Sequence, residues 1–415
     1  MSSNQTSPLP GPSTRRDFLR RGIVGAAAVA AWPTILASLE DDDFPPLPKI
    51  DRRDEAPTAP VSVLRGNDFA VESLARLLEK AFDATGGIEK LVRGKTVTVK
   101  LNTTGTGGRM RGRPAERSYQ THPNHIEALV GLLDRAGAKR IYLVESLYST
   151  DPPEKVYEAQ GWNIGRIHSA SSHKTVFEDT RNRGSFDGYA EIKVPWGGFV
   201  FPRYHLNRRY EETDVVISLA KMKEHITAGV TGAVKNLFGI TPTSLYGNDA
   251  PNEKTTENRG DILHHATRKV PEGVTAELHP DRTPLPEPTE SYFRVPMVTA
   301  DLCGARPIDF SIVEGIETCR GGEGPWCPQT RPIAPGLVIA GRNAVCVDSI
   351  MTVLMGFDPT AGTREKPWYG YNHLDLLARV GVGTNDPSRI EVRGLALEEA
   401  VHPYWPDSGA RGWLE

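Results

Sequence analysis

The sequence predicts an α/β protein in which a mostly parallel sheet is flanked by helices, arranged as two lobes with a site between them. Three observations lead to this prediction. Short apolar segments, typical of buried strands, alternate with segments whose apolar residues recur at helical spacing. The composition, 38% hydrophobic and 24% charged residues, is that of a folded globular protein. The length of 415 residues is sufficient for more than one lobe around a sizeable core.

The predicted elements begin near residue 61. Residues 70–81 show helical spacing, residues 96–101 are typical of a strand, and Pro123 begins a helix that Gly137 ends. Further strands are expected at 141–144, 214–219, 310–313 and 337–340, followed by a helix at 347–354. Ligands of parallel sheets bind beyond the carboxyl ends of the strands, so we expect the site in the loops that follow them.

The folded domain is expected to span residues 61–415, with two irregular excursions. Residues 147–210 are polar, and residues 249–296 are Pro-rich and charged. Both are expected to run over the surface, where either could fold over a site. Residues 41–60 are acidic and Pro-rich, as in a linker.

The N-terminus indicates export. The pair Arg15-Arg16, followed by Phe18-Leu19, precedes an Ala-rich apolar run over residues 23–37. Residues 1–40 therefore resemble a twin-arginine signal peptide. That resemblance implies a transient partner, the twin-arginine translocase, and a periplasmic or other extracytoplasmic location.

Charge, hydropathy and cysteine spacing exclude several classes of protein. The net charge is −3, and the four Arg and two acidic residues of segment 1–40 leave −5 for the rest, so nucleic acid is not an expected partner. No stretch reaches the ~20 apolar residues of a transmembrane helix. The four cysteines form no Cys-x-x-Cys pair, so an iron–sulfur cluster is not expected. Whether Cys319 and Cys327 form a disulfide is left open.

The segment with the most chemistry, residues 220–239, follows the strand at 214–219. It holds three Lys, one His, two Thr and three Gly. Glycines allow close backbone approach to an anion, and a lysine on a half-buried helix loses its proton readily and acts as a base or attachment point. The catalytic candidates are Lys223, His225 and Lys235, and the ligand-binding candidates are Lys221, Gly229, Thr231, Gly232, Lys235 and Asn236. A glycine-packed helix with lysines reaching solvent is the alternative.

Two further pairs complete the candidate site. Lys100 and Asn102 end the strand at 96–101 and precede a Gly-rich loop suited to a phosphate, although a flexible basic loop is the alternative. Glu314 and Glu317 flank the end of the strand at 310–313 and are expected opposite the lysines, as carboxylates for a metal or a proton. Two surface acids are the alternative there.

The motifs now described resemble a known family. Lys221-x-Lys223-x-His225, followed by Gly-Val-Thr-Gly-Ala-Val-Lys-Asn-Leu-Phe-Gly from Gly229, resembles the hallmark of domain-of-unknown-function family 362 (DUF362). Thr121-His122-Pro123 fits as well, and the resemblance covers roughly residues 94–395. It implies the fold and the site more than a reaction, because the activity of the family is not settled.

A more distant similarity concerns the same segment. From His225 to Lys235 the chain fits His-x-x-Ala-Gly-x-Ser/Thr-Gly-x-x-Lys, a run similar to one in lactate racemase and its relatives. That similarity implies that Lys235 tethers a covalently held nickel-type cofactor and that His225 is an acid/base for hydride transfer. It makes His264 or His265 a candidate metal ligand, the alternative being two solvated loop histidines.

Together these features predict an exported enzyme that acts on a small anionic substrate through a Lys/His cluster. Metal-dependent isomerase or oxidoreductase chemistry would fit, with the cofactor unidentified. Two other functions stay open: a non-catalytic protein that captures an anionic ligand, and an accessory protein for exported redox enzymes.

Overall fold

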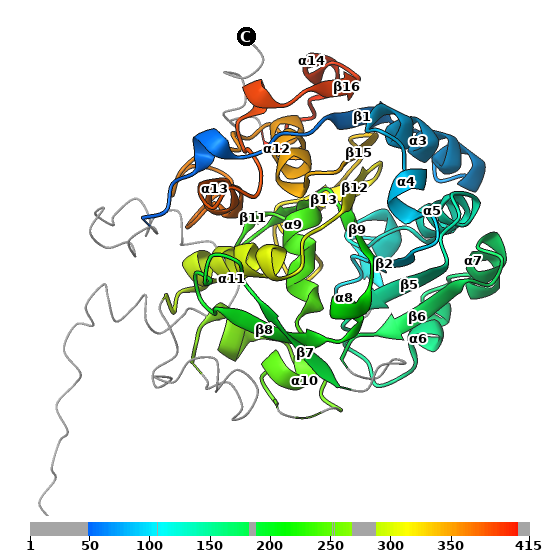
Figure 1. Cartoon of the computed structure of the whole chain (residues 1–415), viewed down its shortest axis with the longest axis horizontal. Coiled ribbons are helices and arrows are strands. Elements are labelled where there is room, and N and C mark those ends of the chain that lie inside the picture. Colours follow the sequence, from blue (N-terminus) through cyan, green and yellow to red (C-terminus); the bar gives the residue numbers. More distant parts are fainter. Residues whose placement is uncertain are drawn as a thin grey trace, which may run out of the picture.

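The computed structural model describes residues 49–105, 107–181, 188–250, 252, 254–267 and 288–405. Its centre is one eight-stranded sheet (Figure 1). From edge to edge its strands are β16 (Val392–Gly394), β1 (Val61–Arg65), β15 (Leu337–Gly341), β12 (Phe310–Gly315), β9 (Val215–Lys221), β2 (Thr96–Lys100), β5 (Arg140–Glu145) and β6 (Thr175–Asp179). The five strands from β12 to β6 run parallel, and β15 is antiparallel to both of its neighbours. The predicted α/β fold with a mostly parallel sheet is confirmed.

Helices cover both faces of the sheet. One face carries α3 (Val71–Ala84), α5 (Pro123–Arg135) and α7 (Ile164–Ala170), and the other carries α9 (Gly232–Asn236), α11 (Ser291–Ala305), α12 (Ala344–Leu354) and α13 (His373–Arg379) (Figure 1). Each face has its own apolar core, and both cores are built on one continuous sheet rather than on the two lobes expected from the sequence. All seven residues of β9 are buried, as expected for a central parallel strand covered on both sides.

Capping residues explain where the main helices begin. Pro123 is the first residue of α5, and the His122 ring nitrogen Nδ1 accepts the backbone N–H of Asn124. Asn343 caps α12 by accepting the N–H groups of Val345 and Cys346. The smaller elements are α4 (Glu89–Val92), β3 (Arg109–Met110), β4 (Arg113–Pro114), α6 (Pro153–Ala159), β7 (Tyr189–Lys193), β8 (Arg203–Asn207), α8 (Arg209–Glu212), β10 (Glu224–His225), β11 (Gly229–Val230), α10 (Thr243–Tyr246), β13 (Thr318–Arg320), β14 (Arg331–Ile333) and α14 (Leu397–Ala400).

The segment 147–210 differs from the irregular excursion that its polarity suggested. It contains α6, α7 and β6, and β6 is an edge strand of the main sheet. Four of its charged side chains are buried in two ion pairs: Arg181 with Asp179 at 2.7 Å, and Arg209 with Glu178 at 2.7 Å. The remaining described charged residues of this segment are exposed or half-buried, so its polarity comes from both buried ion pairs and a solvated surface.

The predicted signal peptide and residues 41–48 of the predicted linker lie outside the described residues. The described end of the linker packs on the domain: Arg389 donates to the carbonyl oxygens of Arg53 and Ala56, and Thr384 donates its N–H to that of Pro57. Of the described helices, none has the length and apolar character needed to cross a bilayer.

Candidate functional site

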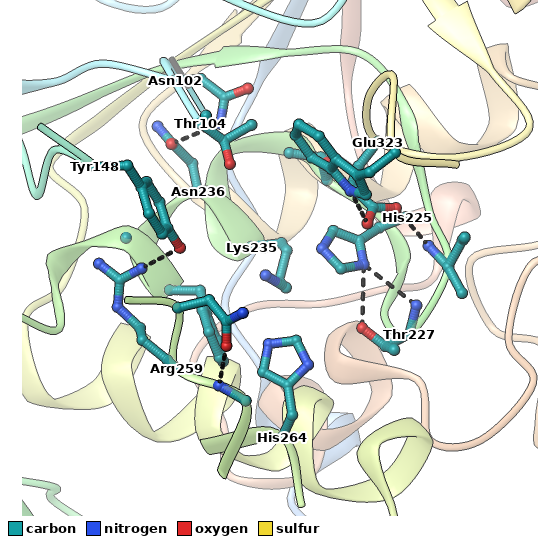
Figure 2. Close-up of a pocket in the computed structure, with 18 of the residues that line it drawn as sticks. Asn102, Thr104, Tyr148, His225, Thr227, Lys235, Asn236, Arg259, His264 and Glu323 are labelled. Carbon is teal, nitrogen blue, oxygen red and sulfur yellow. Dashed lines mark hydrogen bonds between the residues drawn. The ribbon is translucent and has the colours of Figure 1, made fainter. Parts of the chain in front are cut away.

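A cavity of about 670 Å³ opens at the carboxyl ends of β2, β5 and β9 (Figure 2). These ends lie at one edge because Lys100 is opposite Val144 on one side and Ser218 on the other. The cavity is therefore where parallel-sheet topology predicts a site. Nine of the predicted site residues line it: Lys100, Asn102, Lys223, His225, Thr231, Lys235, Asn236, His264 and His265.

Lys235 has the most unusual environment among the lysines of this cavity. It lies on α9 and is only 6% exposed, with its Nζ 4.0 Å from the centre of the Phe238 ring. Within the part of the chain that the structure describes, this Nζ makes no hydrogen bond or ion pair. Burial lowers the pKa of Lys235 to about 7; the charge of Glu323 opposes this shift, and the positive charges of Arg259, Lys223 and Lys100 add to it. Much of this amine is therefore neutral at physiological pH.

Arg259 is the second cation with unused hydrogen-bonding capacity. Its side chain is 5% exposed, donating from Nε to the Thr241 carbonyl oxygen at 2.8 Å and from Nη1 to the Tyr148 hydroxyl at 3.0 Å. Its remaining nitrogen, Nη2, is buried with no partner among the described residues. The hydroxyl of Thr231, which also lines the cavity, is likewise buried without a hydrogen-bond partner among the described residues. A buried guanidinium nitrogen without a partner is costly, so these groups favour an anionic ligand.

His225 is held in a defined tautomer. Its Nδ1 accepts the backbone N–H of Thr227 at 3.2 Å, so the neutral ring carries its proton on Nε2. Burial, then the charges of Lys235 and Lys223, lowers the pKa of His225 well below its usual value, which keeps the ring neutral. Figure 2 shows the imidazole facing the same space as Lys235 and His264. In this form His225 is a proton donor at Nε2.

The floor of the cavity is a hydrogen-bonded network between β2 and α9. Lys100 pairs with Glu145 at 2.6 Å, and burial lowers the pKa of Lys100 although Glu145 opposes the shift. The amide oxygen of Asn236 accepts from Asn102 at 2.9 Å. Gly239 is required beside the pair, because a Cβ there would lie 2.9 Å from both charged groups. Lys100 and Asn102, predicted from a different loop, thus join the 220–239 segment.

Lys221 is the last residue of β9, Lys223 lies just beyond it, and the two lysines differ in role. Lys223 lines the cavity and donates to the carbonyl oxygens of Tyr119 at 2.7 Å and Glu323 at 3.1 Å, and burial lowers its pKa to about 8. Lys221 is fully buried against Glu314, 2.6 Å away, and lines no part of the cavity. Burial raises the pKa of Glu314, but Lys221 and His125 outweigh it and hold that pKa below its usual value.

Glu317 does not face the lysines. It forms two hydrogen bonds with Arg117, at 2.6 and 2.7 Å, and lines a separate surface pocket with His122. Of the two carboxylates expected opposite the lysines, Glu314 therefore lies against Lys221 outside the cavity, and Glu317 pairs with an arginine instead. The register explains this, since Glu314 is opposite Lys221 rather than Lys223 on adjacent strands.

The glycines of the motif serve packing rather than ligand approach. Gly232 has a φ of +53°, and a Cβ there would lie 2.4 Å from the carboxylate of Asp348. Asp348, from α12, accepts the N–H groups of Ala233 at 2.7 Å and Val234 at 2.8 Å. The N–H groups expected to hold an anion are thus bonded to a carboxylate of the protein itself. Gly229 is required for a similar reason, because a Cβ there would lie 2.3 Å from the ring of Trp368.

The metal-binding expectation has limited geometric support. His264 and His265 both line the cavity, with ring centres 6.1 Å apart. Burial, then Lys235, lowers the pKa of His264 well below its usual value, so its ring is neutral and able to ligate. No three His, Cys, Asp or Glu side chains converge as ligands anywhere in the described ranges. Cys319 and Cys327 are both buried free thiols.

Among the cavity residues that were not predicted as site residues, four carry the chemistry or the shape of the wall: Tyr148, Arg259, Glu323 and Trp326. Tyr148 follows the end of β5 by three residues, so the rule on loops after strands could have identified it. Arg259 lies in the charged, Pro-rich segment 249–296, where no pattern distinguishes one arginine from its neighbours. Glu323 and Trp326 lie in a Gly-rich loop that returns to the cavity only through the fold.

Comparison with known proteins gives distant similarities. The chain is 22% identical over 349 residues to thylakoid-associated protein sll1697 of Synechocystis sp., covering 83% of this chain and 89% of that protein. Among solved structures it is similar to the lactate racemase apoprotein of Thermoanaerobacterium thermosaccharolyticum, with 14% identity, a TM-score of 0.34 and coverage of 70% of this chain. A Thermotoga maritima protein gives 15% identity, a TM-score of 0.33 and 66% coverage. The chain spans 56% of the length of either solved structure.

The family assignment is more specific than these similarities. The model of a family described as a domain of unknown function, DUF362, matches residues 97–353. That range is more than half of the 415 residues, and it contains every predicted site residue discussed above. The chain therefore belongs to the DUF362 family.

Proposed function

We propose that this protein is an enzyme that binds a small anionic substrate in the cavity at the carboxyl ends of β2, β5 and β9. In the proposal, Lys235 and Arg259 hold the anionic group, and His225 and Lys235 exchange protons with the substrate. The proposal includes export through the twin-arginine pathway, as segment 1–40 predicts.

One observation carries the proposal: two nearly buried cations, Lys235 and Arg259, line the same cavity with nitrogens that no described residue uses. The carboxylates in the wall do not supply a partner. Glu145 is bonded to Lys100, and Glu323 accepts from the Ile226 N–H and the Trp326 indole N–H. The third carboxylate, that of Asp261, forms no ion pair with Lys235 or Arg259 in the described structure. A carboxylate or phosphate on a ligand would satisfy both cations.

The chemistry follows from the protonation states. A group with a pKa near the working pH can both give and take a proton, and Lys235 meets this condition. His225 carries its proton on Nε2 and is suited to donate it to an oxygen of the substrate. A base and an acid lining one cavity support proton transfer next to a carboxylate or carbonyl group.

A covalently held nickel-type cofactor is a second candidate, favoured by the unpaired amine of Lys235. The residues present fit such a group, since Lys235 would carry it and the neutral imidazole of His264 would be the metal ligand. When bound, it would supply hydride acceptance. Intact mass and elemental analysis test this: added mass on Lys235 with stoichiometric nickel supports it, and an unmodified mass without metal contradicts it.

The first prediction concerns substitutions in the cavity. Lys235→Met should weaken the binding of small carboxylates or phosphates about 10- to 100-fold, because one charge-assisted hydrogen bond is lost. His225→Gln should retain binding and lose turnover, measured as exchange of substrate hydrogen for deuterium in heavy water. The exposed Lys90→Met is the matched control and should change neither. Loss of affinity without any exchange in the parent protein would instead indicate a capture protein.

The second prediction is a pH dependence of that affinity. An anion prefers the protonated amine, so binding should be tightest below pH 7 and weaken as Lys235, with its pKa of about 7, loses its proton. A second decline should follow near pH 8, where Lys223 titrates. Calorimetric titration from pH 6 to 9 measures both steps. In Lys235→Met the lower step should disappear, and its persistence there would contradict the assignment.

A further inference from the structure

Trp326 stands at the cavity with half of its surface uncovered. The side chain is 49% exposed, and only one other large apolar residue among those described, Ile50, is comparably exposed. Ile50 lies near the described N-terminal end, whereas Trp326 lines the cavity that also holds Lys235 and Arg259. An isolated exposed apolar residue needs no explanation, but one in the wall of a cavity lined by cations does.

The indole is fixed in place rather than free to turn. Its Nε1–H donates to Glu323 Oε1 at 2.9 Å, and Glu323 Oε2 in turn accepts the N–H of Ile226 at 3.0 Å. Its ring meets that of Tyr119 edge to face, with centres 5.7 Å apart. A Cβ at Gly324 would lie 2.5 Å from the indole, so that glycine is required for this position. The loop thus presents a rigid aromatic surface.

We infer that the ligand of this cavity is an aromatic anion: a planar ring that packs on Trp326 and carries a carboxylate or phosphate that reaches Lys235 and Arg259. The inference rests on the proposed function, which supplies the anionic half. The aromatic half is independent of it and comes from Trp326 alone. Ring-on-ring packing is favourable because it covers apolar surface and adds a specific aromatic contact. A cavity of about 670 Å³ is in the range that accommodates such a molecule.

The two cations and the aromatic residue come from different parts of the chain. Lys235 lies on α9 and Arg259 lies in the segment 254–267, whereas Trp326 lies in the loop after β13. Separate segments thus supply the charged and the aromatic parts of the wall. A ligand with both groups would contact all of them at once, which a simple inorganic anion would not.

The test uses naphthoate and naphthyl phosphate, each beside its fully saturated ring analogue, and the full chain with Trp326→Leu or Trp326→Phe. Both variants lose the hydrogen bond to Glu323, so the difference between them isolates the aromatic face. We expect the parent protein to bind the aromatic member of at least one pair about five- to tenfold more tightly than its saturated analogue. Trp326→Leu should abolish that preference, and Trp326→Phe should keep most of it.

The outcomes separate this inference from the proposed function. Equal affinity for aromatic and saturated anions in the parent protein would overturn the inference and leave the anion site intact. An equal loss of affinity for the aromatic and the saturated anion in Trp326→Leu would also overturn the inference, because it would indicate that Trp326 holds the loop in place. Failure of every anion to bind the parent protein would overturn the proposed function as well. The pair that shows the preference identifies the anionic group as carboxylate or phosphate.

Discussion

Replacing Gly232 with Ala should destabilise the protein by about 2–5 kcal/mol. The residue has a φ of +53°, which costs an L-residue about 1–2 kcal/mol. The new Cβ would also lie 2.4 Å from the carboxylate of Asp348, and overpacking of this kind costs about 1–3 kcal/mol. Asp348 cannot easily move away, because it is fully buried and bonded to two N–H groups of α9. Urea denaturation measures the change in the free energy of unfolding.

The two causes can be separated. Gly94 also has a positive φ, +71°, but a Cβ there would meet nothing within 4 Å, so Gly94→Ala should cost only the backbone part. Truncating Asp348 to Ala should relieve the clash, so the double variant should lose less than the sum of the single losses. Equal losses for Gly232→Ala and Gly94→Ala would contradict the importance of the contact with Asp348. Ligand affinity should also fall in Gly232→Ala, because Lys235 is on the same short helix.

The sheet and its main helices were predictable because their patterns are local. The strand expected at 214–219 is β9, Val215–Lys221, and its apolar run reflects burial on both faces. The helix expected from Pro123 to Gly137 is α5, which ends at Arg135. The 147–210 segment was not predictable in this way, because Arg181 and Arg209 suggest a surface while their carboxylate partners hold them inside.

The site was predictable only where residues follow strands directly. Lys100 and the cluster around Lys235 meet because parallel strands end at one edge, which topology alone predicts. Glu314 also ends a strand, yet its side chain pairs with Lys221, a choice set by strand register that the sequence does not reveal. Trp326 reaches the cavity through a loop that no periodic pattern describes.

The buried pair of Lys221 and Glu314 gives the second large prediction. Lys221→Met should cost about 3–5 kcal/mol at neutral pH, since it leaves a carboxylate buried without its counterion. The double variant Lys221→Met/Glu314→Gln should recover most of this, because Gln carries no charge and still accepts the backbone N–H of His122. The exposed pair of Arg135 and Glu79 is the control, and Arg135→Met should change stability by no more than about 0.5 kcal/mol.

The sign of the pH dependence makes this prediction sharper. In the parent protein the pKa of Glu314 lies below its usual value, so the pair stabilises the fold above about pH 4.5 and its contribution is lost as the pH falls through the folded pKa. In Lys221→Met burial is opposed only by His125 and His122, so the pKa of Glu314 rises relative to the parent protein and the folded variant takes up a proton more readily than the folded parent does. The stability deficit should therefore be greatest at neutral pH and should narrow on acidification.

Anion affinity, measured where Lys221→Met is fully folded, should equal that of the parent protein, because Lys221 lines no part of the cavity. A deficit that does not vary with pH would contradict the pairing of Lys221 with the Glu314 carboxylate. A loss of anion binding by the folded variant would show that Lys221 acts on the ligand.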